Sequence, residues 1–182
     1  VAAPRIGMTL DGLNPAFDPA LLSRIEDAGL NASAPPQQIW LDGWLVRFSP
    51  GKAKRARCVN AVAVGRLAVD ARLHACEALF AEAGLPMIVR ITPFTLPREL
   101  DGLLDSQGLY RFDDTRVMAL ADLSAAVANK ATLPPGTEVH ATGLEAFAQR
   151  VGNLRGSPLS QRQAHGQRLQ NSPVPFHAFE ML

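Results

Sequence analysis

Cysteines and long apolar runs are both scarce in this sequence. Its two cysteines, Cys58 and Cys76, are too few for a disulfide framework, so we expect two reduced, partly buried thiols. No apolar run approaches the roughly 18 to 20 residues that cross a bilayer, and the opening VAAPRIGMTLDGL lacks the features of a signal peptide. These absences exclude a disulfide-rich secreted fold and a membrane partner, and they predict a cytoplasmic protein.

An excess of one charge is also missing. The 18 Lys and Arg side chains and the 17 Asp and Glu side chains leave a net charge of +1, which does not indicate a nucleic-acid partner. The histidines are scattered without the spacing of metal ligands, so we expect no metal site. Only local clusters of charge are therefore informative.

What the sequence does contain is a strand-rich central segment, Gln37 to Val64. Strand formers run through residues 38–48, a Ser-Pro-Gly turn with a basic tip follows, and a second apolar run occupies residues 57–66. We predict that these two runs pair antiparallel, with Trp44 against a helix over residues 68–83. Trp40 and Trp44 are four positions apart, so strand alternation places both on one side of the sheet, either in the core or as aromatics of a cleft.

Acidic residues are absent between Asp42 and Asp70, and basic residues fill this gap. Two interpretations stay open: the charges protect an exposed turn and an edge strand, or they hold an anionic ligand. A nucleic acid is not favoured, because no base-stacking aromatic motif accompanies the charges. The candidate ligand contacts are Arg47, Arg55, Arg57 and Arg66, together with Arg90 from a later strand that could point into a cleft.

Helical and strand patterns alternate along the rest of the chain. Asp18 and Pro19 begin a short helix that we expect to end at Gly29, and residues 68–83 form the clearest helix. The pattern then predicts a central strand over 87–92, a helix over 97–108 and a long strand over 109–123 with Val117 and Ala119 on one face. After a Pro-Pro-Gly break, it predicts a strand at 138–142, helices from 144 and over 159–170, and a strand at 176–182.

These elements predict an α/β (α+β) fold in which helices flank a mixed sheet. The chain divides into a loosely held arm over 1–16, a first module over 17–123, a linker over 124–136 and the opening of a second module over 137–182. The last strand is apolar and would leave an open edge. We therefore expect it to join a sheet of the same chain, or to pair with a second copy in a homodimer.

The central motifs resemble a known family. The succession IEDAGLNASAPPQQIWLDGWLVRFSPGKAKRARCVNAV, followed by PMIVRITPFTLPRELDGLLDSQGLYR, is similar to the N-terminal half of bacterial GNAT-superfamily N-acetyltransferases. The shared order is a D-G-W-L-L-R-like strand, a basic turn, a second strand, an F-R-I-T-P-like strand and an E-L-D helix ending in G-Y, within residues 25–120. Ser33 stands where the family tends to have Trp, and Arg57-Cys58 where it tends to have Asn-Ser.

The resemblance implies a GNAT-like, mostly antiparallel sheet and transfer of acetyl from acetyl-CoA to an amine. The family holds the pyrophosphate of acetyl-CoA with a Q/R-x-x-G-x-G/A loop at a helix start, whereas VAVGRLAVDARL here has one glycine. The first module therefore looks like a degenerate GNAT-like half. The acetyl-CoA loop would lie in a second GNAT-like module, beyond Leu182. We expect the chain to be a fragment or a truncated protein that does not bind acetyl-CoA by itself. The catalytic base and the amine stay unassigned. The alternative is a non-catalytic binding or regulatory module whose basic hairpin holds an acidic ligand or partner.

Overall fold

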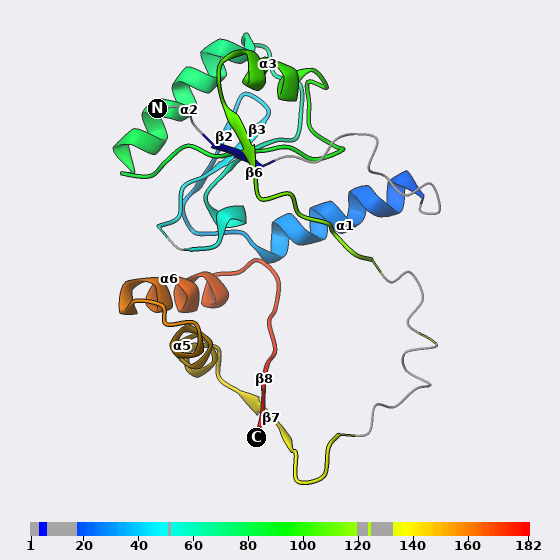
Figure 1. Ribbon diagram of the computed structural model, residues 1–182, viewed down its shortest axis with the longest axis vertical. Helices are drawn as coiled ribbons and strands as arrows, with labels where there is room; N and C mark the ends of the chain where they lie inside the picture. The colour runs from blue at the N-terminus through cyan, green and yellow to red at the C-terminus, as the bar shows by residue number, and fades with distance from the viewer. Residues whose placement is uncertain (1–3, 7–17, 51, 120–123, 125–132) are drawn as a thin grey trace.

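The computed structural model describes residues 4–6, 18–50, 52–119, 124 and 133–182, which form two units stacked along the long axis (Figure 1). The first, here called the sheet unit, contains residues 4–6 and 18–112. The second, the helix-pair unit, contains residues 133–182. The elements of the sheet unit are β1 (Pro4–Ile6), α1 (Pro19–Ala32), β2 (Gln38–Leu41), β3 (Trp44–Arg47), the short 3-10 helix η2 (Lys54–Ala56), β4 (Val59–Ala61), α2 (Val69–Glu82), β5 (Val89–Arg90), α3 (Leu100–Ser106) and β6 (Tyr110–Phe112).

The sheet unit is built on one mixed sheet with the strand order β2-β3-β4-β5-β1-β6. Strands β2, β3 and β4 pair antiparallel, whereas β4–β5, β5–β1 and β1–β6 pair parallel. Helix α2 connects β4 to β5, as a parallel pairing requires. The predicted α+β class, with helices flanking a mixed sheet, is confirmed.

The sheet separates two layers of helices. Trp44 and Val46 of β3 belong to an apolar core with Leu73 and Phe80 of α2 and Leu104 of α3. The next residues along β3 point to the opposite face, because side chains alternate across a strand. There Arg47 reaches the last turn of α1, so α1 covers the face that α2 and α3 leave open.

A tight turn divides the segment that we expected to be one strand. Residues 38–48 form β2 and β3, joined by Asp42 and Gly43 with φ angles of 42° and 85°. Both φ angles are positive, as a type I′ turn requires, and Asp-Gly is a strong sequence signal for it. The prediction of one continuous strand over residues 38–48 was therefore wrong. The antiparallel pairing of residues 38–48 with 57–66 is confirmed, because β3 pairs with β4 in the same sheet.

The turn also separates the two tryptophans. Trp44 lies opposite Leu41 on β2, whereas Trp40 lies opposite Leu45, so the two indole rings face opposite sides of the sheet. Trp44 is fully buried, at 0% exposed, and the guanidinium of Arg72 lies 4.4 Å from its ring centroid. Trp40 is 67% exposed. The prediction that Trp44 lies in the core is confirmed. The prediction that Trp40 and Trp44 lie on the same side of the sheet was wrong.

Two boundaries near the N-terminus also differ from the sequence-based expectation. Residues 4–6, part of the expected loose arm, form a strand between β5 and β6, because main-chain pairing does not depend on side-chain periodicity. The other residues of that arm lie outside the described part of the chain. Helix α1 continues through Gly29 to Ala32, and the guanidinium of Arg55 lies in the space that a side chain at Gly29 would fill.

The strand expected over 109–123 is much shorter. Only Tyr110–Phe112 pair as β6, because Asp113 has a φ of 58°, which an extended strand does not accommodate. Val117 is exposed and does not face a core. Residues 120–123 and most of the expected linker lie outside the described residues. Helix α3 begins at Leu100 rather than at Pro97.

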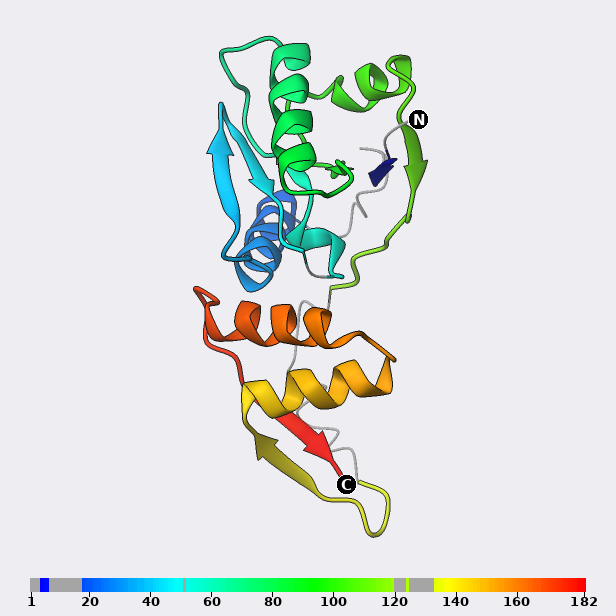
Figure 2. The same ribbon diagram turned by 90° about the vertical axis from the view of Figure 1, so that its left-hand side faces the viewer.

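The helix-pair unit follows the expected order: β7 (Val139–Thr142), α5 (Leu144–Leu154), α6 (Leu159–Gln170) and β8 (Ala178–Met181). Strand β8 pairs antiparallel with β7, so the prediction that the last strand joins a sheet of its own chain is confirmed. Helix α6 lies between α5 and the sheet unit in both ribbon views (Figures 1 and 2).

The opposite environments of the two tryptophans give a matched stability test. Trp44→Ala should lower the free energy of unfolding by about 3 to 5 kcal/mol, because it opens a cavity in the core beneath α2. Trp40→Ala should change it by less than about 0.5 kcal/mol, because the ring is largely in solvent. Urea denaturation of the two variants measures both values. Similar losses at the two positions would contradict the assignment of faces.

Candidate functional site

The side chain of Arg47, one of the expected ligand contacts, lies in the protein interior. Its guanidinium is buried and donates from Nη2 to the carbonyl oxygen of Leu30 at 2.9 Å, from Nη1 to Ser33 Oγ at 3.2 Å and from Nε to Gln38 Oε1 at 3.0 Å. Burial lowers its pKa to about 10. Arg47 therefore ties the C-terminus of α1 to the sheet, where a cation suits the helix dipole. Ser33, a departure from the family pattern, is part of this connection.

Arg90 is also held internally. Its guanidinium pairs with both carboxylate oxygens of Glu26 on α1, with Nη2 donating to Oε2 at 3.0 Å. Burial is the largest single effect on Arg90 and lowers its pKa, but the hydrogen bonds that Arg90 donates to Glu26 and the charge of Glu26 together outweigh it, so the pKa of Arg90 is raised. Arg90 also lines a small cavity of about 100 Å³ with Asn60 and Thr92, but the carboxylate of Glu26 already balances its charge.

The remaining predicted contacts do not converge on one site. Arg55 packs against Gly29 of α1, and Arg57 is half-buried beyond η2. Arg66 is 98% exposed at the other end of the hairpin, beside Asp42. Trp40 is 67% exposed on the edge strand β2. The structure thus distributes Arg47, Arg55, Arg57, Arg66 and Arg90 over several places in the sheet unit.

The loop before α2, which has one glycine where the family has its pyrophosphate loop, receives a carboxylate from the chain itself. The backbone N–H of Leu67 donates to Asp42 Oδ2 at 2.7 Å, and the side chains of Arg66 and Arg72 lie 3.8 and 3.9 Å from the same carboxylate. Hydrogen bonds from the backbone N–H groups of Arg66 and Leu67 hold the pKa of Asp42 below 3.8. Asp42 therefore holds the loop just before α2, whose first helical residue is Val69 and which no described side chain caps.

Gly65 serves this internal contact. A Cβ atom at Gly65 would overlap the carboxylate of Asp42 and crowd the guanidinium of Arg72. The single glycine of VAVGRLAVDARL therefore makes room for Asp42.

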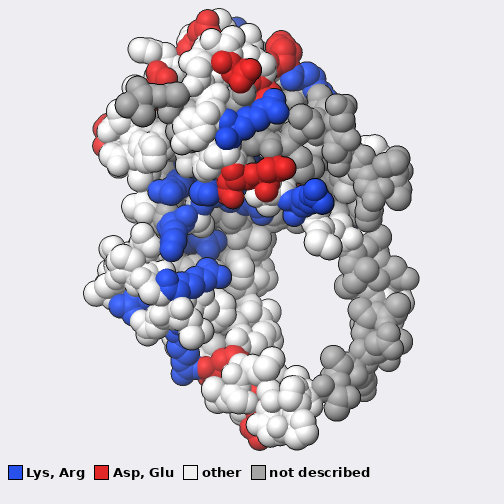
Figure 3. Space-filling model, in the orientation of Figure 1, with Lys and Arg blue, Asp and Glu red and all other residues white. Residues whose placement is uncertain are grey.

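A basic cleft lies between the sheet unit and the helix-pair unit. Its volume is about 530 Å³, and it is bordered by the loop that follows β3 and by α5 and α6. Lys52 comes from the loop, Arg155 from the end of α5, and Arg162 and Arg168 from α6. Blue Lys and Arg side chains gather between the two units in the space-filling view (Figure 3).

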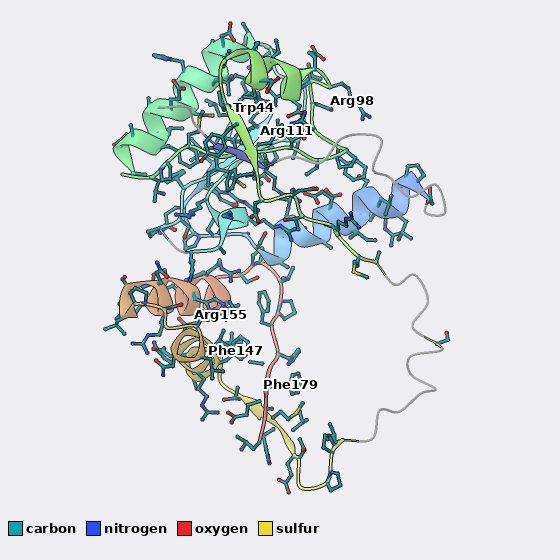
Figure 4. The ribbon with its side chains drawn as sticks, in the orientation of Figure 1. Trp44, Arg98, Arg111, Phe147, Arg155 and Phe179 are labelled. Atoms are coloured by element: carbon teal, nitrogen blue, oxygen red, sulfur yellow. The ribbon has the colours of Figure 1, made fainter. Side chains whose placement is uncertain are left out.

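The cleft is cationic throughout its described lining, which contains no Asp or Glu. His165 also lines it and makes an edge contact with Phe147 of α5, with 6.3 Å between ring centroids. Burial, Arg168 and Arg155 lower the pKa of His165, so its imidazole is neutral at pH 7. Burial likewise lowers the pKa of Arg168. Figure 4 shows Phe147 and Arg155 on the helix-pair unit.

The sequence interpretation missed this cleft although a signal was present. Arg162, His165 and Arg168 recur every three residues, which places them on one side of α6. No acidic residue occurs between Glu145 and Glu180. This second acid-free stretch meets the acid-free hairpin in the fold.

The chemistry available in the described residues is anion binding. Among them, no group of three or more His, Cys, Asp or Glu side chains could hold a metal ion. Burial raises the pKa of the Cys58 thiol to about 11 and that of Cys76 to about 12, so neither is a ready nucleophile. No described helix is long and apolar enough to cross a membrane.

Comparisons with known proteins give no match. No family model, no curated protein and no solved structure is similar to this chain. The family resemblance therefore rests on the quoted motifs.

The carboxylate of Asp42 gives a pH-dependent test. Asp42→Asn retains a residue that accepts positive φ but removes the charge, so the variant should be less stable than the parent at pH 7. Because the folded-state pKa of Asp42 is lowered, its stabilisation is present above 3.8 and is lost as the pH falls through the folded-state value. The difference between the two proteins should therefore shrink below that pH.

Urea denaturation from pH 2.5 to pH 7 measures this dependence. Asp113→Asn is a matched control, because Asp113 also has a positive φ and its ion pair with Lys54 is at the surface. A pH-independent loss in Asp42→Asn would contradict the electrostatic role.

Proposed function

We propose that this chain is the N-terminal part of a GNAT-type N-acetyltransferase, which moves acetyl from acetyl-CoA to an amine. The observation that carries the proposal is the order of elements. After β1, the chain runs through helix α1, the strands β2 to β4, the long helix α2, β5, the short helix α3 and β6. The resemblance implies the same order with two hairpin strands in place of three. The short helix α3 ends at Ser106 and is followed by Gly108, Leu109 and Tyr110, so one residue separates the Gly and Tyr that adjoin in the quoted motif.

The helix-pair unit supports the second part of the proposal, the opening of a catalytic-type module. Val139 and Met181 are paired on one face of the β7–β8 sheet, with Ala141 and Phe179 beside them (Figure 4). All four side chains are exposed, so this apolar face is uncovered in the described residues. An isolated pair of strands is marginal in water, and further strands would complete such a sheet.

The proposal assigns no acetyl-CoA site to the sheet unit. The loop before α2 has one glycine and already donates the N–H of Leu67 to Asp42, whereas pyrophosphate needs several converging N–H groups at a helix start. Transfer would proceed by direct attack of the amine on the thioester, because the buried thiols do not suit a covalent intermediate. We place the protein in the cytoplasm, where free thiols such as Cys58 and Cys76 are the rule.

A second candidate function is a binding or regulatory module for an acidic ligand. The basic cleft favours it, because Lys52 from the hairpin loop faces the arginines of the helix-pair unit. The two candidates differ in whether acetyl transfer occurs.

The decisive experiment uses the reading frame that encodes this chain, continued downstream of Leu182. We expect a Q/R-x-x-G-x-G/A loop there, and we expect the purified product to release CoA thiol when given acetyl-CoA and an accepting amine. Residues 1–182 alone serve as the control and should release none. A product that has no such loop and no transferase activity over a broad amine panel would favour the binding module instead.

Calorimetry with acetyl-CoA tests the assignment of the cofactor site. Residues 1–182 at physiological salt should bind it with a Kd weaker than about 100 µM, because exposed charges alone give weak association that salt screens. A Kd of about 10 µM or lower, worth about 7 kcal/mol, would contradict the proposal. Such a result would return the cofactor site to the first module if the Kd is unchanged by Arg168→Gln, because Arg168 lines the basic cleft and lies outside that module.

A further inference from the structure

We propose that the basic cleft binds a small molecule carrying two or more phosphate groups. The inference deepens the binding function suggested by the cleft, and it holds whether or not the chain belongs to an acetyltransferase. Three features support it: the way the cleft is built, the unmatched charge inside it, and its size.

The walls of the cleft are held by close packing. On the helix side, Gly152 of α5 lies against the side-chain stem of Arg162, where a Cβ atom would overlap the stem. Nη1 of Arg162 donates to Asn153 Oδ1, so this guanidinium is already oriented. Gly166 packs closely on Ala148, which brings α5 and α6 together. Because the stem and the head of Arg162 are fixed, less side-chain entropy is lost when a ligand binds.

The loop side is closed in the same way. The backbone N–H of Ser49 donates to the carbonyl oxygen of Ala56 at 3.1 Å, which ties together the two ends of the loop that carries Lys52. Ala56 is buried and forms part of the cleft wall. Lys52 is thus presented from a closed loop that faces α6.

Within the part of the chain that the structure describes, no acid pairs with the charges of the cleft. Lys52, Arg155 and Arg168 form no ion pair with any described residue, and Arg162 bonds only to an amide. Arg150 on the same helix pair is different, because it pairs with Glu180 outside the cleft. Burial lowers the pKa of Arg168, and burial together with Arg168 and Arg155 lowers the pKa of His165, so these side chains lose solvation in the cleft. A bound polyanion would remove this cost.

The size and number of charges select the ligand class. A volume of about 530 Å³ falls within the range of about 300 to 1,000 Å³ that is typical of small-molecule sites. Phosphate groups supply close to two negative charges each in a compact volume, and guanidinium groups bind them with two parallel hydrogen bonds. The whole chain is close to neutral, so it lacks the broad basic surface that a nucleic acid would need.

Calorimetry with inorganic pyrophosphate at 150 mM NaCl tests the proposal on residues 1–182. We expect a Kd below about 1 mM for the parent and at least a tenfold weaker Kd for Arg155→Gln and for Arg168→Gln, because each variant removes a charge-assisted contact. Arg24→Gln is the matched control, because Arg24 is an exposed arginine on α1 outside the cleft. It should bind as the parent does.

Thermal unfolding separates a ligand site from a structural cluster. Without ligand, Arg168→Gln should melt at the same temperature as the parent or about 1 to 3 °C higher, because it relieves repulsion between unpaired cations. Pyrophosphate should raise the melting temperature of the parent but not that of Arg168→Gln. A lower melting temperature for the ligand-free variant would assign the arginines a structural role and overturn the proposal.

Other outcomes identify a different ligand. Absence of binding heat, or equal weakening by Arg24→Gln, would overturn the site. Tighter binding of citrate or of an acidic peptide than of pyrophosphate would replace the phosphate ligand with a carboxylate one. None of these results depends on acetyl transfer, so failure here and failure of the transferase proposal can be told apart.

Discussion

The turn at Asp42 and Gly43 is the constraint on which most of the sheet unit depends. It fixes the pairing of β2 with β3, and the pleat then directs Trp44 to α2 and Arg47 to α1. A shift by one residue would exchange the two faces of β3 and place a guanidinium in the apolar core. The carboxylate of the same turn also holds the start of α2. Strand register and helix position therefore depend on one dipeptide.

Elements with a strong local pattern could be predicted from the sequence. The helix expected over 68–83 is observed as Val69–Glu82, and the helix expected over 159–170 is observed with the same bounds. Their periodicity and their glycine or proline boundaries are local signals. The Asp-Gly turn was equally visible, but the apolar residues on both sides of it favoured one continuous strand. The strand over 4–6 has no local signal, because its partners come from β5 and β6.

The candidate site was less predictable, because whether an arginine is free to bind a ligand depends on residues that are distant in the sequence. Arg47 and Arg90 were reasonable ligand contacts until the fold brought Leu30 and Glu26 of α1 to them. The cleft requires a loop after β3 to face helices near the other end of the chain. Composition could show that each segment lacks acids, but only the fold shows that the two segments meet.

The contact between Asp42 and Gly65 links two positions of the sequence to each other. Gly65 leaves room for the carboxylate, and the carboxylate accepts from backbone N–H groups in the loop before α2 that would otherwise need water or a ligand. A side chain at position 65 would expel Asp42 from this place, whereas a shorter residue at 42 would leave those groups open to a foreign anion. During divergence the two positions are expected to change together. A descendant that lost Asp42 but kept Gly65 would have the starting point of a new anion site.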